Sequence, residues 1–204
     1  MIGILNYGMG NIGSVENMLR YIGSKSTIVY ESSQLHNIDK LILPGVGRFD
    51  KAMEKINDIP EMKETLDYIA LKKQIPILGI CLGMQLLTNF SEEGNVAGLG
   101  WIDGKTQKFP LIDQLKIPHM GWNTANKNMH LALTKDLSST NRYYFVHSYF
   151  VKVSDEASRM MTTNYGIEFD SGIINRSGNV FGVQFHPEKS HKFGMQILKN
   201  FAQI

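Results

Sequence analysis

The one cysteine of this 204-residue chain lies in the stretch GICLGMQ, where Gly79 precedes Cys81 by two positions and Gly83 follows it by two. The apolar run at 75–80 predicts a buried strand, and the spacing of apolar residues over 82–90 predicts a helix. A nucleophile on such a tight turn needs neighbours without side chains, because a Cβ there would collide with the backbone. We therefore predict that Cys81 is a nucleophilic thiol held on a strand-to-helix elbow.

The start of a helix favours thiolate chemistry at this cysteine. The positive end of the helix dipole and the unpaired N–H groups of the first turn stabilise a negative charge on sulfur. The backbone N–H of Leu82 would point to the place where an oxyanion forms during attack on a carbonyl carbon. For the elbow taken alone, a simpler interpretation stays open: Cys81 could be a small buried side chain, with glycines that let a strand meet a helix.

A second motif, VFGVQFHPEKS, supplies the groups that a nucleophilic thiol requires. His186 ends a strand-like run, and Glu188 follows two positions later, on the same side of an extended segment. The carboxylate can therefore hold the imidazole in one tautomer and one orientation. A histidine at a strand end is by itself more often a surface residue, but the elbow and the His-x-Glu pair together favour a triad of Cys81, His186 and Glu188.

No metal or cofactor is expected from the remaining residues. The other histidines lack the spacing of metal ligands, and a single cysteine cannot build a cysteine-rich metal site. His147, in YFVHSYF, could line a pocket at the end of a strand, although a structural role fits it equally well. The sequence thus predicts a site in which side chains and backbone groups alone carry the chemistry.

Composition and charge exclude several classes of function. Lys and Arg number 21 against 19 Asp and Glu, with no basic run, so neither nucleic acid nor an anionic membrane is indicated as a partner. The longest apolar stretch is too short to span a bilayer, and the N-terminus shows no basic leader. We expect a soluble cytoplasmic protein.

The elements that position these motifs predict an α/β fold. Short apolar runs alternate with amphipathic stretches in the first half, which is typical of a parallel sheet covered by helices. Strand-like segments dominate the second half before a final helix in SHKFGMQILKNFA, so antiparallel strands should extend the sheet. The Gly-rich piece at 92–104 marks the passage between the halves. A chain of this length without repeats or linkers predicts one domain over residues 1–204.

With these motifs and the upstream LPGVG, the sequence resembles the class I, triad-type glutamine amidotransferases. The resemblance covers essentially the whole chain. It implies a flavodoxin-like, mostly parallel sheet flanked by helices with added antiparallel strands. It also implies hydrolysis of L-glutamine to L-glutamate and ammonia through a cysteine thioester. Cys81 would be the nucleophile, His186 the base and later the acid, and Glu188 the orienting carboxylate.

The same resemblance implies further site residues. A tetrahedral oxyanion needs two N–H donors, and the family places the second in the loop that reads PGVG here, around Val46 and Gly47, opposite Leu82. Three positions match those that hold the substrate glutamine in the family: Gln85, Ser148 and Tyr149.

A partner protein is implied as well, because free ammonia is protonated in water and the chain shows no acceptor domain. The stretches NYGMGN, PHMGWN and YYFVHSY are similar to a branch of the family that passes ammonia to a cyclase subunit of (β/α)8-barrel type in histidine biosynthesis. Asn11 and Lys189 are candidates for contacts in this heterodimer, although solvated polar residues would look the same. A paralogous branch that supplies an amidotransferase of surface-sugar biosynthesis stays open, since its catalytic residues would be identical.

The first loop allows a competing hypothesis. Gly8, Gly10 and Gly13 spell G-x-G-x-x-G between a strand and a helix, and Glu31 follows the second strand, as in a dinucleotide-binding oxidoreductase. That function would leave the elbow and the His-x-Glu pair unexplained, and the chain offers no separate substrate domain. A scaffold that kept the fold and lost its activity is disfavoured by the complete triad.

Overall fold

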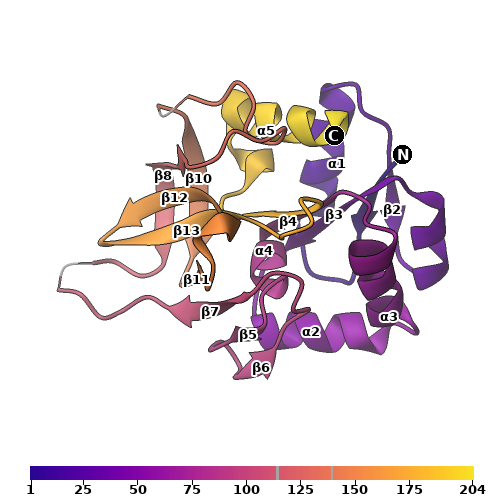
Figure 1. Cartoon of the computed structure of the whole chain (residues 1–204), viewed down its shortest axis with the longest axis horizontal. Helices are drawn as coiled ribbons and strands as arrows, with labels where there is room; N and C mark the ends of the chain where they lie inside the picture. The colour runs from indigo at the N-terminus through magenta and orange to yellow at the C-terminus, as the bar shows by residue number, and fades with distance from the viewer. Residues whose placement is uncertain (114, 139) are drawn as a thin grey trace.

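The computed structural model describes residues 1–113, 115–138 and 140–204, and its main feature is a mixed sheet of order β2-β1-β3-β4-β14-β13-β11-β7-β5-β6 (Figure 1). Its parallel part consists of β2 (Ser26–Val29), β1 (Ile2–Leu5), β3 (Lys40–Gly45), β4 (Ile77–Cys81) and β14 (Val180–Val183). This is the strand order of flavodoxin-like sheets, so the predicted fold class is confirmed.

Antiparallel strands extend the sheet beyond β14, as the second half of the sequence predicts. They are β13 (Ile167–Ile174), β12 (Arg159–Tyr165), β11 (Tyr149–Val153), β9 (Asn126–Lys127) and β7 (Gly104–Lys108), followed by the short β5 (Phe90–Ser91) and β6 (Val96–Ala97). In this part of the sheet, β5 and β7 pair in parallel. Every other pairing among its described strands is antiparallel.

A separate antiparallel ribbon of β8 (His119–Thr124) and β10 (Arg142–His147) stands beside the main sheet (Figure 1). The sequence suggested one strand-like run over 142–153. In the structure this run bends at Ser148, so that β10 belongs to the ribbon and β11 to the main sheet. Val146, two residues before the bend, has its carbonyl oxygen 3.9 Å from Cys81 Sγ.

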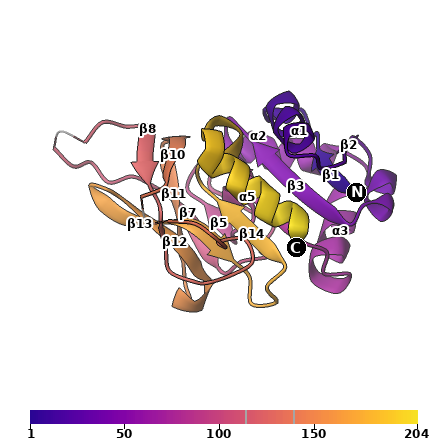
Figure 2. The ribbon, with the colours of Figure 1, turned by 90° about the horizontal axis from the view of Figure 1, so that it is seen from above.

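Helices cover both faces of the parallel strands (Figures 1 and 2). On one face lie α1 (Ile12–Tyr21) and α5 (His191–Gln203), and on the other lie α2 (Phe49–Asp58) and α3 (Met62–Asp67). The short α4 (Leu82–Leu86) begins directly at the end of β4. The short 3₁₀ helices η1 (Ser32–Asn37), η3 (Glu156–Ser158) and η4 (Pro187–Lys189) and the π-helical segment η2 (Tyr68–Lys72) complete the set.

Side chains of the central strands belong to two apolar clusters, one on each face of the sheet. Leu41 and Leu43 of β3 join the cluster that also contains residues of α2 and α3, whereas Ile42 joins the one with α1 and α5. This follows from the two-residue period of a strand, which sends successive side chains to opposite faces. Because both faces are covered, the run KLILPG is apolar without alternation.

The helix predicted after the elbow ends earlier than the sequence indicates, and α3 changes its helical type near its end. The helix predicted over 82–90 stops at Leu86, where the Thr88 hydroxyl donates to the Gln85 carbonyl at 2.8 Å and competes with the helical pattern. After Asp67, α3 continues into the wider η2 turn, in which the Lys73 N–H donates to the Tyr68 carbonyl five residues back. Neither change moves Cys81 from the junction of β4 and α4.

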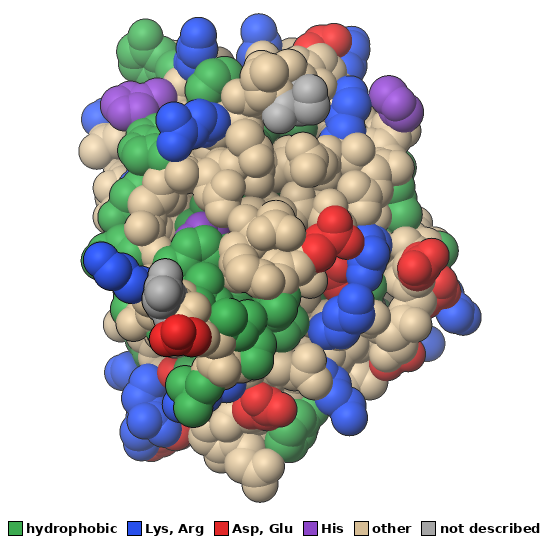
Figure 3. Space-filling model, turned by 90° about the vertical axis from the view of Figure 1, so that its left-hand side faces the viewer, with side chains coloured by type: hydrophobic (Ala, Val, Ile, Leu, Met, Phe, Trp, Pro, Cys, Tyr) green, Lys and Arg blue, Asp and Glu red, His purple; other side chains and the backbone are tan. Residues whose placement is uncertain are grey.

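No helix in the described part of the chain is long and apolar enough to cross a membrane. Acidic and basic side chains are interspersed on the face that carries the antiparallel strands (Figure 3). That distribution agrees with the small net charge of +2.

Candidate active site

Cys81 forms the strand-to-helix elbow that the sequence predicts. Its φ of 54° lies in the left-handed region, which is unusual for a residue with a side chain and is typical of strained functional turns. A Cβ on Gly79 would lie 2.6 Å from the Gly83 carbonyl oxygen, and one on Gly83 would lie 1.8 Å from the Leu43 oxygen. Both glycines are therefore required for α4 to pass so close to β4 and β3.

The thiol of Cys81 is 6% exposed and lies among polar groups. The Gln184 side-chain amide donates toward its Sγ at 3.7 Å, and the Val146 carbonyl oxygen lies 3.9 Å away. The N–H of Leu82 belongs to the first turn of α4, where backbone N–H groups have no partner within the helix. The Leu82 N–H therefore has no partner within its own helix and follows the sulfur-bearing residue directly in the chain.

His186 and Glu188 form a buried pair. The imidazole Nδ1 lies 2.8 Å from Glu188 Oε1, and the two side chains are 1% and 2% exposed. The geometry differs slightly from the predicted extended segment, because β14 ends at Val183 and Glu188 lies in the η4 turn. The backbone of His186 is anchored to the ribbon through its N–H, which donates to the Tyr144 carbonyl at 2.9 Å.

The electrostatics of this pair favour a charged imidazole. Burial, the largest influence, lowers the pKa of His186, but Cys81 and Glu188 together outweigh it and raise the pKa to about 10. The opposite ring nitrogen, Nε2, is buried and has no hydrogen-bond partner among the described residues. His186 also belongs to the wall of the cavity beside Cys81.

A cavity of about 300 Å³ opens beside Cys81. Its wall contains these predicted site residues: Val46, Gly47, Cys81, Leu82, Gln85, Ser148, Tyr149 and His186. Glu188 stands behind His186, outside the residues that line the cavity. The interface candidates Asn11 and Lys189 also lie outside it, and Lys189 is exposed with its Nζ 5.9 Å from the centre of the Tyr144 ring.

The parallel register brings the PGVG loop to the elbow. Gly45, the last residue of β3, is paired with Cys81, the last residue of β4, so Val46 and Gly47 continue beside the thiol. Gly47 has a φ of +107°, a conformation that side chains rarely adopt. Tyr7 supports this loop, because its buried hydroxyl donates to the Pro44 carbonyl at 2.9 Å.

Several residues of the cavity wall were not identified from the sequence: Glu93, Pro118, Val146 and, just behind the wall, Gln184. Gln184 is fully buried and lies two positions before His186, so the alternation of an extended segment could have indicated it. Glu93 accepts a hydrogen bond from the Phe49 N–H at 2.9 Å. It comes from the Gly-rich piece, whose path no periodicity predicts.

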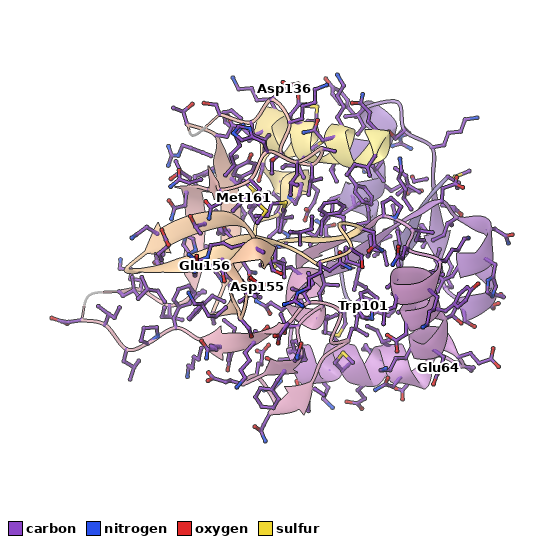
Figure 4. The ribbon with its side chains drawn as sticks, viewed as in Figure 1. Glu64, Trp101, Asp136, Asp155, Glu156 and Met161 are labelled. Atoms are coloured by element: carbon purple, nitrogen blue, oxygen red, sulfur yellow. The ribbon has the colours of Figure 1, made fainter. Side chains whose placement is uncertain are left out.

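That Gly-rich piece is anchored to the body of the protein by Trp101 (Figure 4). The indole Nε1 donates to Asp67 Oδ1 of α3 at 2.7 Å, and the ring is 5% exposed. The indole stabilises the position of this segment, because its ring is buried among apolar groups and its N–H has a hydrogen-bond acceptor. Glu93 therefore reaches the cavity from a well-anchored loop.

The features of the dinucleotide hypothesis have other roles in the structure. Glu31 caps η1, where its side chain accepts from the backbone of Gln34 in a capping box. Gly8 and Gly10 have φ of 84° and 151°, so they shape the loop between β1 and α1. Among the described residues, no group of three or more His, Cys, Asp or Glu is arranged to hold a metal ion.

Comparisons with known proteins identify similar sequences over the whole chain. A family model described as glutamine amidotransferase class-I matches residues 3–204. The imidazole glycerol phosphate synthase subunit HisH 2 of Methanococcus maripaludis is 47% identical over 203 residues, which cover 100% of this chain and 99% of that protein. The subunit HisH of Bdellovibrio bacteriovorus is 42% identical over 207 residues, covering 100% of both chains.

Solved structures share the fold at much lower identity. A crystal structure of a glutamine amidotransferase superposes with a TM-score of 0.77 at 15% identity, covering 100% of this chain and 99% of that one. The structure of PurLQS from Thermotoga maritima superposes with a TM-score of 0.75 at 18% identity, covering 99% of this chain and 97% of that one.

Proposed function

Because this chain belongs to the class I glutamine amidotransferase family, we propose that it is the glutaminase subunit of an imidazole glycerol phosphate synthase, which hydrolyses L-glutamine to L-glutamate and ammonia in histidine biosynthesis. The observation that carries the proposal is the elbow thiol of Cys81, which shares one cavity with His186, whose ring is bonded on its far side to the buried Glu188 carboxylate. We further propose that residues 1–204 act as one domain, in the cytoplasm, where a free thiol stays reduced.

Acylation begins with the transfer of the Cys81 proton to His186 Nε2. The thiolate attacks the side-chain amide carbon of glutamine, and the carbonyl electrons move onto oxygen. We assign stabilisation of this oxyanion to the N–H groups of Leu82 and of the loop at Val46 and Gly47. The imidazolium then returns its proton to the departing nitrogen, the C–N bond breaks, and ammonia leaves a thioester on the sulfur.

Deacylation uses the same groups in the reverse sense. His186 Nε2 takes a proton from water, the hydroxide attacks the thioester carbon, and a second tetrahedral oxyanion forms in the same hole. Collapse of this intermediate breaks the C–S bond and releases glutamate, while the proton returns to the sulfur. Glu188 keeps Nδ1 protonated throughout, so that Nε2 is always the nitrogen that exchanges protons.

The cavity wall offers complementary groups for the substrate. We assign the α-ammonium group of glutamine to the Glu93 carboxylate, because it is a negative charge on the wall. The Gln85 amide nitrogen donates to the Tyr149 carbonyl at 3.0 Å and to Gln184 Oε1 at 3.1 Å, so its oxygen remains as an acceptor for the substrate. Backbone groups at Ser148 and Tyr149 complete the proposed contacts.

A cyclase subunit of (β/α)8-barrel type is the proposed acceptor of the ammonia. Asn11 follows the carboxyl end of β1, the same edge of the sheet at which Cys81 ends β4, and exposed Lys189 follows the catalytic pair. Met120 and Trp122 of β8 are 62% and 38% exposed, and exposed apolar side chains near a site favour a docking surface. We propose that this edge faces the cyclase.

The test measures glutamate release by the complex with the cyclase. Wild type should be active, and Cys81→Ala should lose activity while its thermal melting stays close to wild type, since the change removes a small, mostly buried sulfur. No glutamate release by wild type with the partner bound would refute the proposal.

A co-purification experiment tests the acceptor. The tagged chain should capture the histidine-pathway cyclase, and Lys189→Glu should weaken capture while Lys199→Glu, an exposed position on α5, leaves it unchanged. Capture of a surface-sugar amidotransferase instead would assign the ammonia to that pathway.

A further inference from the structure

Two buried histidines form a direct hydrogen bond next to the active site. His119 and His147 face one another at the last pair of the β8–β10 ribbon, with His119 Nδ1 2.9 Å from His147 Nε2. The residues are 2% and 6% exposed. On its other side, His147 Nδ1 lies 2.7 Å from the Tyr149 carbonyl oxygen, across the bend at Ser148.

The partners determine where each proton lies. A carbonyl can only accept, so His147 must donate from Nδ1, and a neutral ring then accepts at Nε2. His119 must therefore donate from its own Nδ1, and its Nε2 accepts from the Asn123 side-chain amide at 3.2 Å. Burial lowers the pKa of His119 to about 4, and burial, with smaller contributions from His119 and His186, lowers that of His147 to about 3.

The Tyr149 carbonyl links this pair to the catalytic groups. It accepts from His147 and also from Gln85 Nε2, at 3.0 Å. Gln85 in turn donates to Gln184 Oε1 at 3.1 Å, and the Gln184 amide nitrogen reaches Cys81 Sγ at 3.7 Å. A continuous series of hydrogen bonds thus runs from the ribbon, along the cavity wall, to the nucleophile.

The surroundings of the pair are aromatic, so packing alone does not call for histidine. The His119 ring stacks on Tyr165 and Phe145, with centroids 4.0 and 4.7 Å apart, and Phe169 contacts both histidines edge-on. Phenylalanine in both positions would fill this space without burying polar nitrogens. The nitrogens therefore serve the bond to the Tyr149 carbonyl.

We propose that the His119–His147 pair positions the cavity wall at Tyr149 for glutamine hydrolysis, an inference that rests on the proposed function. In the tautomer that carries a proton on Nδ1, His147 holds the carbonyl at the bend between β10 and β11. His119 enforces that tautomer by donating to Nε2. Without this donor, His147 can place its proton on Nε2, and two lone pairs then face each other at Tyr149.

Variants of His119 separate positioning from packing. His119→Phe keeps the aromatic stack and removes the donor, and we expect the KM for glutamine to rise about tenfold, the effect of one lost hydrogen bond in the substrate wall. His119→Asn places an amide N–H near the position of Nδ1 and should restore a KM within about threefold of wild type. Phe145→Leu perturbs the same cluster without touching the hydrogen bonds and should leave the KM unchanged.

The KM decides between the two roles, because a purely structural role would lower the amount of active enzyme and therefore kcat, but not the KM. An unchanged KM in His119→Phe, or an equal rise in Phe145→Leu, would overturn the proposal.

Nitrogen NMR of the wild type tests the tautomer even if a variant fails to fold. Protonated and bare imidazole nitrogens resonate far apart, and we expect protons on Nδ1 of both His119 and His147. A proton on Nε2 of His147 would refute the inference. This readout needs no catalysis, so it stays informative if wild type releases no glutamate, which would refute the proposed function instead.

Discussion

Replacing Glu188 by Gln isolates the electrostatic part of the proposed triad. Glutamine can still offer an oxygen to His186 Nδ1, so the ring keeps its orientation and loses only the negative charge that lies 2.8 Å away. For charges centred about 4 Å apart in an effective dielectric constant of about 20, Coulomb's law gives about 4 kcal/mol. If the imidazolium of the transition state loses this stabilisation, kcat/KM falls about a thousandfold.

The assay is glutamate release by the complex with the cyclase at several glutamine concentrations. Glu54→Gln, the same chemical change on a side chain that is 55% exposed, serves as the matched control and should keep wild-type kcat/KM. Thermal denaturation of both variants checks that the native fold persists. If Glu188→Gln keeps more than about a tenth of the wild-type kcat/KM, the charge of Glu188 does not stabilise the transition state as the Coulomb argument requires.

Further predictions concern stability. Gly83→Ala would place a Cβ 1.8 Å from a backbone oxygen of β3 and should lower the free energy of unfolding by about 3 kcal/mol, whereas Gly13→Ala, with open space around it in α1, should be neutral or stabilising; urea denaturation compares them. Arg159→Met should lower the free energy of unfolding by about 3 kcal/mol, because it leaves the fully buried Asp170 carboxylate, whose Oδ1 lies 2.7 Å from the guanidinium, without its positive partner. An unfolding free energy close to that of wild type would contradict this prediction. His147 has a folded pKa of about 3 against 6.5 in the unfolded chain, so the unfolded state binds more protons on acidification. Between roughly pH 7 and pH 5.5 this histidine should lower the unfolding free energy by about 1 kcal/mol, and His147→Asn should show a shallower pH dependence in the same assay.

Local sequence patterns were sufficient to predict the elbow at Cys81. The apolar run before Cys81, the helical spacing after it and the two glycines each follow from sterics within a few residues, and the structure places Cys81 at the junction of β4 and α4. The His186–Glu188 pair was accessible for the same reason, since the two residues are separated by only one position. The exact path between them, a 3₁₀ turn instead of a strand end, was not predicted.

Contacts between distant segments could not be predicted in this way. Glu93 lies between the short strands β5 and β6 and accepts a hydrogen bond from the distant Phe49 N–H, and periodicity carries no information about such a contact. Alternation places Gln184 on the same side as His186, but the contact of its amide with Cys81 Sγ follows from the pairing of β14 with β4, which the sequence pattern does not specify. The competing G-x-G-x-x-G hypothesis shows the opposite error, since glycines that shape a loop look the same whether or not a phosphate is nearby.

The sequence by itself determined the fold class and the nucleophile elbow, because patterning and turn sterics act over short distances along the chain. Only the tertiary structure decided how the elbow meets its partners. The register of β3 against β4 brings Val46 to Cys81, and the bend at Ser148 carries one strand-like run from the ribbon into the main sheet. It also decided the protonation of His147, because the tautomer of a buried imidazole depends on which donors and acceptors the fold places around it.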